Sequence, residues 1–315
     1  MKKKLGIGLL ILVLLITGST LGVCFYLIDY TLLPANEYKD QHRAMASMCD
    51  KYPHITPWLD SLQQHQALKD TFSTAPDGIR LHAYYAQASR PKRETAVIIH
   101  GYTDCALRMI HIGYLYNHSL DFNILLPDLR HSGLSEGDAI QMGWLDRKDI
   151  MQWIDVAPSL FGDSIQTVVH GISMGAATTM MVSGEQLPQY VKCFVEDCGY
   201  TSAWDQFAKE LNGRFGLPIF PILYISNWLC DLKYGWDFKE ASSVKQVAKC
   251  KLPMLFIHGD SDDFVPTDMI HEVFAAKPQP KEMWIPPHSA HAQSYSNHPE
   301  EYTRRVKEFV EKSFK

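Results

Sequence analysis

The chain begins with a long apolar segment. Three lysines at positions 2–4 precede residues 5–28, which include no charged side chain. As a helix this segment would be about 36 Å long, enough to cross a hydrocarbon core of about 30 Å. The apolar part of a cleaved signal peptide usually runs only ~7–15 residues, and no Ala-x-Ala site ends this segment. The pattern therefore predicts an uncleaved transmembrane anchor over residues 1–28, with a cleaved signal sequence as the alternative.

The same lysines predict the orientation of this anchor. After the apolar segment, the nearest basic residues are Lys39 and Arg43. Because positive charge is enriched on the cytoplasmic side of a membrane span, we expect a single-pass protein with its N-terminus inside and the rest of the chain outside the cytoplasm. If the segment were a cleaved signal, the chain would instead be secreted.

Beyond the anchor, residues 29–69 are mostly polar and predict a helical neck. From residue 70 to 315, short apolar runs alternate with stretches long enough for helices, such as 146–160 and 176–186. The runs expected to be strands are 79–86, 96–100, 122–127, 165–170, 191–195, 253–258 and 282–286. This alternation predicts one α/β domain with a mostly parallel sheet and helices on both faces. Such sheets place their functional residues in loops at the carboxyl ends of the strands.

The amino-acid composition argues against several classes of function. Hydrophobic residues make up 46% of the chain and charged residues 21%, and the net charge is −5. No basic run occurs beyond the first four positions, so a nucleic-acid partner is not expected. The seven cysteines form no C-x-x-C pair and no Cys/His ligand spacing, so neither a zinc site nor a disulfide framework is predicted.

A nucleophile motif follows the strand expected at 165–170. Gly171-Ile172-Ser173-Met174-Gly175 fits Gly-x-Ser-x-Gly and leads into the small residues 176–179. In a nucleophile elbow the glycines let strand and helix pass closely, while the turn holds the serine hydroxyl at the sheet edge. Residues 133–137 match the same string around Ser135 but follow no strand directly. We therefore assign the nucleophile to Ser173 and predict a surface turn at 133–137.

A serine nucleophile needs a base and an acid that orients the base. A late apolar run ends in His258 and is followed by carboxylates at 260, 262 and 263, and His291 follows the last expected strand. Ser173, an aspartate of 260–263 and His291 thus occur in the order Ser–Asp–His. Asp197, after an earlier strand, is an alternative acid, and His288 is an alternative base.

These motifs resemble the α/β-hydrolase family, and more closely its bacterial single-domain branch related to serine aminopeptidases and prolyl-oligopeptidase-type catalytic domains. The stretches that support the resemblance are 100–102, 126–130, 171–175, 196–200, 258–266 and 290–292. The resemblance implies an eight-stranded sheet and a small helical lid at about 204–236. It also favours Asp262 as the acid and His291 as the base, and it implies that no metal or organic cofactor is required.

The resemblance also implies a mechanism. Ser173 would attack a carbonyl carbon, His291 would accept the serine proton, and Asp262 would orient the imidazole. The backbone N–H groups of Tyr102 and Met174 would stabilise the negative charge on the carbonyl oxygen. Together these N–H groups would form an oxyanion hole. A further hypothesis is that the Tyr102 phenol also donates a hydrogen bond in this hole or packs on the substrate.

The expected substrate is a small-molecule ester. The lid segment is rich in bulky apolar residues, which would form a packed helical cap over the cleft or line an acyl or aromatic pocket that favours lipid-like esters at the membrane surface. A short peptide is the alternative, if the chain is an aminopeptidase-type enzyme that uses Glu196, Asp197 or Asp205 to hold a free amine. Acyl transfer is a second alternative. A binding protein without activity would be expected to have lost at least one triad position, and none is lost here.

Overall fold

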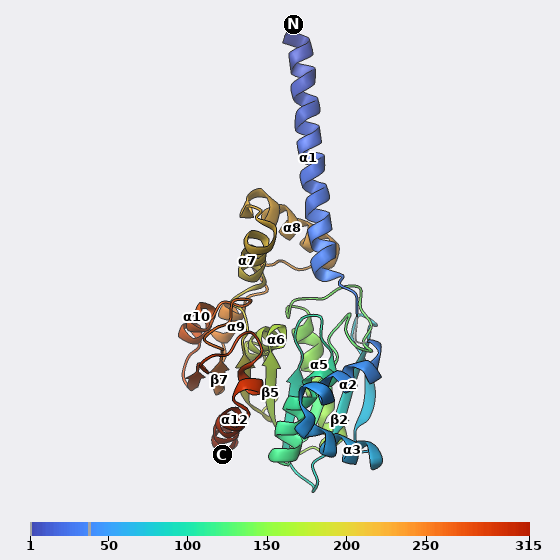
Figure 1. Ribbon diagram of the computed structural model, residues 1–315, viewed down its shortest axis with the longest axis vertical. Helices are drawn as coiled ribbons and strands as arrows, with labels where there is room; N and C mark the ends of the chain where they lie inside the picture. The colour runs from blue at the N-terminus through green and yellow to red at the C-terminus, as the bar shows by residue number, and fades with distance from the viewer. Residues whose placement is uncertain (1, 37–38) are drawn as a thin grey trace.

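A mostly parallel, eight-stranded sheet lies at the centre of the computed structural model, which describes residues 2–36 and 39–315 (Figure 1). The strand order is β1-β2-β4-β3-β5-β6-β7-β8. Strands β3 to β8 run parallel, and β2 runs antiparallel to both β1 and β4. The predicted fold class is confirmed.

Seven of the strands lie where the apolar runs predict them, within about two residues at each end. The strands are β1 (Lys69–Thr74), β2 (Arg80–Ala86), β3 (Glu94–Ile99), β4 (Asn123–Pro127), β5 (Gln166–Ile172), β6 (Val191–Asp197), β7 (Met254–Ile257) and β8 (Lys281–Trp284). The sequence did not predict β1, because this edge strand is polar and largely exposed.

Both faces of the sheet are covered by helices. Alternating side chains of β3 and β5 point to opposite faces, so that Val97 and Val169 belong to one core and Ile98 and Val168 to the other. The first face packs against α5 (Asp146–Phe161), α6 (Met174–Ser183), α9 (Ser243–Val247) and α10 (Asp268–Ala276). The second packs against α4 (Ile110–Tyr114), the single π-helical turn that follows it (Leu115–Ser119) and α12 (Pro299–Ser313).

The segment expected as a neck contains α2 (Gln41–Lys51) and α3 (Thr56–Gln64). The Asp40 carboxylate caps α2 by accepting a hydrogen bond from the N–H of Arg43. Met48, Trp58 and Leu59 are buried in the second core. These helices therefore form part of the layer on that face of the sheet, and they do not stand apart from it.

Three helices lie beyond the carboxyl edge of the sheet. The helices α7 (Ala203–Phe215) and α8 (Ile219–Tyr234) connect β6 to β7 at the predicted position of the lid. Helix α1 (Lys2–Leu32) projects away from the sheet, and its C-terminal end lies beside α8 (Figure 1). Within the described residues, Lys4–Leu32 is the helix long and apolar enough to cross a membrane.

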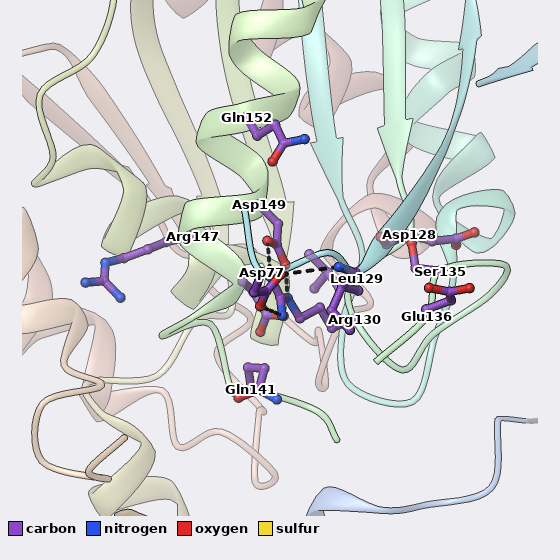
Figure 2. Close-up of polar contacts among 12 residues, drawn as sticks. Asp77, Asp128, Leu129, Arg130, Ser135, Glu136, Gln141, Arg147, Asp149 and Gln152 are labelled. Atoms are coloured by element: carbon purple, nitrogen blue, oxygen red, sulfur yellow. Dashed lines mark hydrogen bonds and ion pairs between the residues drawn. The ribbon is translucent and has the colours of Figure 1, made fainter. Parts of the chain in front are cut away.

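An arginine links the loop after β4 to helix α5 and to the loop before β2. Figure 2 shows Arg130 between Asp149 of α5 and Asp77, and its guanidinium donates hydrogen bonds to both carboxylates. The side chain of Asp149 is buried, that of Arg130 is partly buried and that of Asp77 is exposed. The network fixes the loop that follows β4, near the site described next.

Candidate active site

Ser173 lies at a sharp turn between β5 and α6. Its backbone has φ 59° and ψ −120°, a region that residues other than glycine rarely adopt. The two flanking glycines allow this turn. A Cβ on Gly171 would lie 2.0 Å from the carbonyl oxygen of Gly175, and one on Gly175 would lie 2.2 Å from that of Ile99. Because only glycine fits at both positions, the predicted nucleophile elbow is present in the backbone.

The hydroxyl of Ser173 is part of a continuous hydrogen-bonded chain. Ser173 Oγ lies 2.8 Å from His291 Nε2, and His291 Nδ1 lies 2.7 Å from Asp262 Oδ2. The three residues follow β5, β8 and β7, three strands whose carboxyl ends lie at one edge of the sheet. The aromatic ring of Phe264 packs edge-on against the imidazole, with ring centroids 4.9 Å apart. The structure thus brings together the three side chains that the sequence suggests.

Asp262 is held as a carboxylate. Burial alone would raise its pKa, but hydrogen bonds from His258 and His291, the charge of His291 and the N–H of Val265 outweigh burial and lower the pKa below its ordinary value. The backbone N–H groups of Phe264 and Val265 both donate to Oδ1. An ionised, immobile carboxylate is suited to orienting an imidazole.

The alternative acids and base lie elsewhere. Asp260 is exposed and accepts hydrogen bonds from Ser261 and Ser289. His288 is exposed. The buried carboxylate of Asp197 accepts a hydrogen bond from Ser294, and burial raises its pKa to about 6. None of these three is hydrogen-bonded to Ser173 or His291 through its side chain within the described chain.

The two expected oxyanion donors lie beside the serine. Met174 directly follows Ser173, and a Cβ on Gly101 would lie 3.4 Å from Ser173 Cβ, which places the 100–102 loop against the serine. Within residues 2–36 and 39–315, the backbone N–H groups of Tyr102 and Met174 have no hydrogen-bond acceptor. Both remain available to a ligand.

The Tyr102 phenol points away from the proposed oxyanion hole. Its hydroxyl donates a hydrogen bond to the carbonyl oxygen of Thr31, at a distance of 2.7 Å. Burial raises the pKa of Tyr102 to about 12, so the phenol stays protonated. Its ring lines the cavity beside Ser173, and its hydroxyl is hydrogen-bonded to the C-terminal end of α1.

An apolar cavity extends from Ser173 between helices α1, α7 and α8. Its volume is about 940 Å³, open space at its mouth included. The sequence predicts the contribution of the lid residues but misses the wall formed by α1. The wall residues are Phe207, Leu211 and Phe215 of α7, Ile222 and Leu223 of α8, and Leu27, Ile28, Thr31 and Leu32 of α1.

Two further residues differ from expectation or were not foreseen. The expected surface turn is present, since the Ser135 N–H donates to the Ser132 carbonyl and Leu134 is exposed. The Ser135 side chain itself is buried, because its hydroxyl donates to the Asp128 carbonyl and accepts from the His82 N–H. Cys198 comes close to the triad, with its sulfur, an Asp262 oxygen and a His291 nitrogen within 4.8 Å of one another. Burial raises the pKa of the Cys198 thiol well above its ordinary value, so the neutral thiol is favoured.

Comparison with known proteins identifies the family of this chain. Residues 135–315, more than half of the chain, match the prolyl oligopeptidase family. The chain belongs to that family. The resemblance noted in the sequence is thereby confirmed, and this member of the prolyl oligopeptidase family is a hydrolase of the superfamily that includes esterases and peptidases.

Two curated relatives align with most of this chain. The uncharacterized protein YqkD of Bacillus subtilis (strain 168) is 26% identical over 254 residues, covering 80% of this chain and 83% of YqkD. The uncharacterized protein YfhR of Escherichia coli (strain K12) is 24% identical over 244 residues, covering 75% of this chain and 78% of YfhR.

Solved structures share the fold of this prolyl oligopeptidase family member. The esterase Pf2001 of Pyrococcus furiosus superposes with a TM-score of 0.64 at 21% identity, over 79% of this chain and 93% of the esterase. The acylaminoacyl peptidase of Pyrococcus horikoshii superposes with a TM-score of 0.55 at 19% identity, over 79% of this chain and 42% of the peptidase.

Proposed function

We propose that the protein is a membrane-anchored serine hydrolase that cleaves carboxylic esters. The observation that carries the proposal is the hydrogen-bonded chain from Ser173 through His291 to Asp262, which borders an apolar cavity. In this proposal residues 1–28 form the anchor, residues 29–69 join it to the sheet, and residues 70–315 form the hydrolase domain with its lid at about 204–236.

The proposed reaction has two halves. Ser173 Oγ attacks the ester carbonyl carbon while its proton moves to His291 Nε2, and the N–H groups of Tyr102 and Met174 stabilise the carbonyl oxygen as its charge grows. The C–O bond to the alcohol then breaks, and the alcohol leaves with the proton from His291. In the second half, water attacks the acyl-serine with His291 again as base, which releases the acid and restores Ser173.

The charges around the cavity favour an ester over an aminopeptidase substrate. An aminopeptidase needs a carboxylate to hold the free amine of its substrate. Glu196 and Asp197 are fully buried and do not line the cavity, and the Asp205 carboxylate accepts from Thr201 and Ser202. Of the described residues that line the cavity, Glu210 is the acidic one, and it pairs with Lys209 and Arg214.

Peptide hydrolysis remains the second candidate, because the family match and the likeness to an acylaminoacyl peptidase favour an amide substrate. A peptide with a blocked N-terminus would need no carboxylate for a free amine. Acyl transfer would use the same acyl-enzyme with another acceptor in place of water.

Contacts of α1 support an uncleaved anchor. Cys24, Ile28 and Leu32 are buried at four-residue spacing, and the Leu32 carbonyl accepts a hydrogen bond from the N–H of Ile140. Signal cleavage after these residues would remove a wall of the cavity. We further propose that the N-terminal lysines lie inside and the hydrolase domain outside the cytoplasm.

The test is labelling with a fluorophosphonate, followed by hydrolysis of p-nitrophenyl esters of increasing chain length and of matched aminoacyl amides. Ser173→Ala should abolish both labelling and hydrolysis. Ser135→Ala is the matched control, because it changes the other Gly-x-Ser-x-Gly serine and should keep the label.

Labelling that survives Ser173→Ala would overturn the assignment of the nucleophile. Faster turnover of amides than of matched esters would favour the peptidase. For the anchor, carbonate extraction should leave the full-length chain in the membrane, and its release would contradict a membrane span.

A further inference from the structure

Helix α8 exposes a row of large apolar side chains. Phe220, Tyr224, Trp228 and Leu232 follow one another at four-residue spacing, and their exposed fractions are 75%, 48%, 59% and 71%. Residues four apart lie on the same side of a helix. Tyr224, Trp228 and Leu232 therefore lie on one side of α8, and Phe220, whose backbone is not helical, joins them because its ring lies 5.8 Å from that of Tyr224. We call these four residues the α8 face.

Large apolar side chains that are more than 40% exposed lie on α1 and α8. Within the described residues outside α1 and α8, Leu33, Phe72, Leu134 and Met283 are the other large apolar side chains that are exposed, each at 40% or less. Large apolar residues gathered on one exposed surface usually mark a site that contacts another apolar body. The α8 face thus needs a partner.

The position of α8 beside α1 identifies that partner. The thiol of Cys24 lies 3.5 Å from the carbonyl oxygen of Ile222, and the ammonium group of Lys233 lies 3.0 Å from the carboxylate of Asp29. Toward the N-terminus from Cys24, α1 is largely exposed. Residues 5–23 of that helix span about 28 Å, close to the thickness of a hydrocarbon core. Helix α8 therefore begins at the level where α1 leaves the bilayer.

The side chains at this level are of the kind found at a membrane surface. Phe25, Tyr26 and Tyr30 of α1 are exposed, as are Tyr224 and Trp228 of α8. Tryptophan and tyrosine are enriched where the apolar core meets water. The Asp29–Lys233 ion pair lies farther along both helices, on the side away from the span.

The cavity opens next to the same surface. The ring of Tyr26 stacks on that of Tyr30 with centroids 6.0 Å apart, and Tyr30 meets Phe215 edge-on at 5.7 Å. Tyr30 and Phe215 both line the cavity, and Tyr30 is half exposed. Aromatic rings thus lead from α1 to the lining of the cavity that contains Ser173, where the Arg214 guanidinium also donates a hydrogen bond to the Tyr30 hydroxyl.

We propose that the α8 face lies on the lipid bilayer beside α1, and that the substrate is an ester with a long acyl chain that enters the cavity from the bilayer past Tyr30 and Phe215. This inference rests on the proposed function, since it names the substrate class of that site. The bilayer is the partner because the α8 face is continuous with the apolar helix α1. A second protein bound to this face would keep it out of lipid.

Contact of the α8 face with lipid can be measured by a method that does not depend on enzymatic activity. The full-length protein is reconstituted into phosphatidylcholine vesicles that contain a brominated lipid, which quenches tryptophan fluorescence on contact. Trp228→Phe should lower the quenched fraction, whereas Trp284→Phe, which changes a tryptophan on β8, should leave it unchanged. An unchanged quenched fraction in Trp228→Phe would overturn the membrane contact.

Activity tests the route of the substrate. We expect the double variant Phe220→Ser/Trp228→Ser to hydrolyse p-nitrophenyl palmitate in vesicles about tenfold more slowly than wild type, because less apolar area is held in the interface. Its rate on soluble p-nitrophenyl butyrate should not change. Met283→Ser is the control, since it removes an exposed apolar side chain from β8.

The outcomes separate this inference from the proposed function. Equal rates of wild type and double variant on the palmitate ester, or equal losses on both esters, would overturn delivery from the bilayer while leaving the proposed serine hydrolase intact. Hydrolysis of the butyrate ester by Ser173→Ala would instead overturn the proposed function.

Discussion

The Tyr102 hydroxyl connects the end of helix α1 to the loop that carries a proposed oxyanion donor. It donates to the Thr31 carbonyl at 2.7 Å, and the backbone N–H of the same tyrosine is free to face a substrate. Because burial raises the pKa of the phenol to about 12, this bond persists throughout the usual assay range. Tyr102→Phe removes the hydroxyl and leaves the ring and the backbone in place.

The expected effect follows from what is lost and what remains. A single intramolecular hydrogen bond contributes about 0.5–1.5 kcal/mol, so the free energy of unfolding should fall by about 1 kcal/mol. Complete loss of an oxyanion donor costs about 2.7–4 kcal/mol of barrier. Tyr102→Phe keeps the donor and only loosens its loop, so we expect kcat to fall by about 3–10-fold. The KM for a short ester should change little, because the side chains that line the cavity remain.

The assay is steady-state hydrolysis of p-nitrophenyl butyrate by the purified full-length protein. Tyr190→Phe is a matched control, because its hydroxyl also donates to a backbone carbonyl, that of Ile154, at 3.1 Å. This control should lose similar stability without losing kcat. An unchanged kcat in Tyr102→Phe, or an equal loss in both variants, would refute the link between helix α1 and the proposed oxyanion donor.

Three further predictions concern charged groups. Asp262→Asn should lower kcat by roughly 10⁴, because an amide favours the wrong imidazole tautomer; circular dichroism should show an unchanged fold, and a kcat near that of wild type would contradict the assigned acid. Burial, with a smaller effect of the Asp149 charge, raises the pKa of Asp146 from 3.8 to about 7, so the wild type should lose stability as the pH rises from about 4 to 7. Asp146→Asn removes that loss, so its Tm should exceed that of wild type at pH 8 but not at pH 4. A Tm above that of wild type at pH 4 but not at pH 8 would refute the assigned effect of Asp146. Arg130→Met leaves the buried Asp149 unpaired and should cost about 3–5 kcal/mol of unfolding free energy in denaturant titrations, whereas Arg304→Met, in exposed ion pairs, should cost under about 1 kcal/mol; equal costs would contradict this account.

Most of the fold and the candidate triad could be predicted because their signals are local. Ser173 and Asp262 each follow a short apolar run, and His291 comes soon after another, so a parallel sheet brings all three to one edge. The strand β1 escaped prediction because an exposed edge strand has no apolar pattern. The roles of the triad and of the oxyanion donors stay predictions until they are tested.

The features that escaped prediction depend on contacts between distant segments. Nothing in the sequence around Thr31 indicates that its carbonyl receives the Tyr102 hydroxyl, or that this end of α1 forms a cavity wall. Ser135 illustrates the same limit, since its burial depends on His82 and Asp128 on neighbouring strands and loops. Similarly, the lid residues divide between the cavity and the α8 face only once α8 is placed beside α1.

The wall that α1 contributes to the cavity has a practical consequence for anyone who expresses this protein. Truncation after residue 32, the usual way to obtain a fragment without a long apolar N-terminal helix, would take away Leu27, Ile28 and Thr31 together with the rest of α1. The shortened protein would have a groove open on that side in place of the cavity. Its preference among substrates would then be a property of the truncation, and inhibitor screens run on it would select compounds for a shape that the native enzyme does not have.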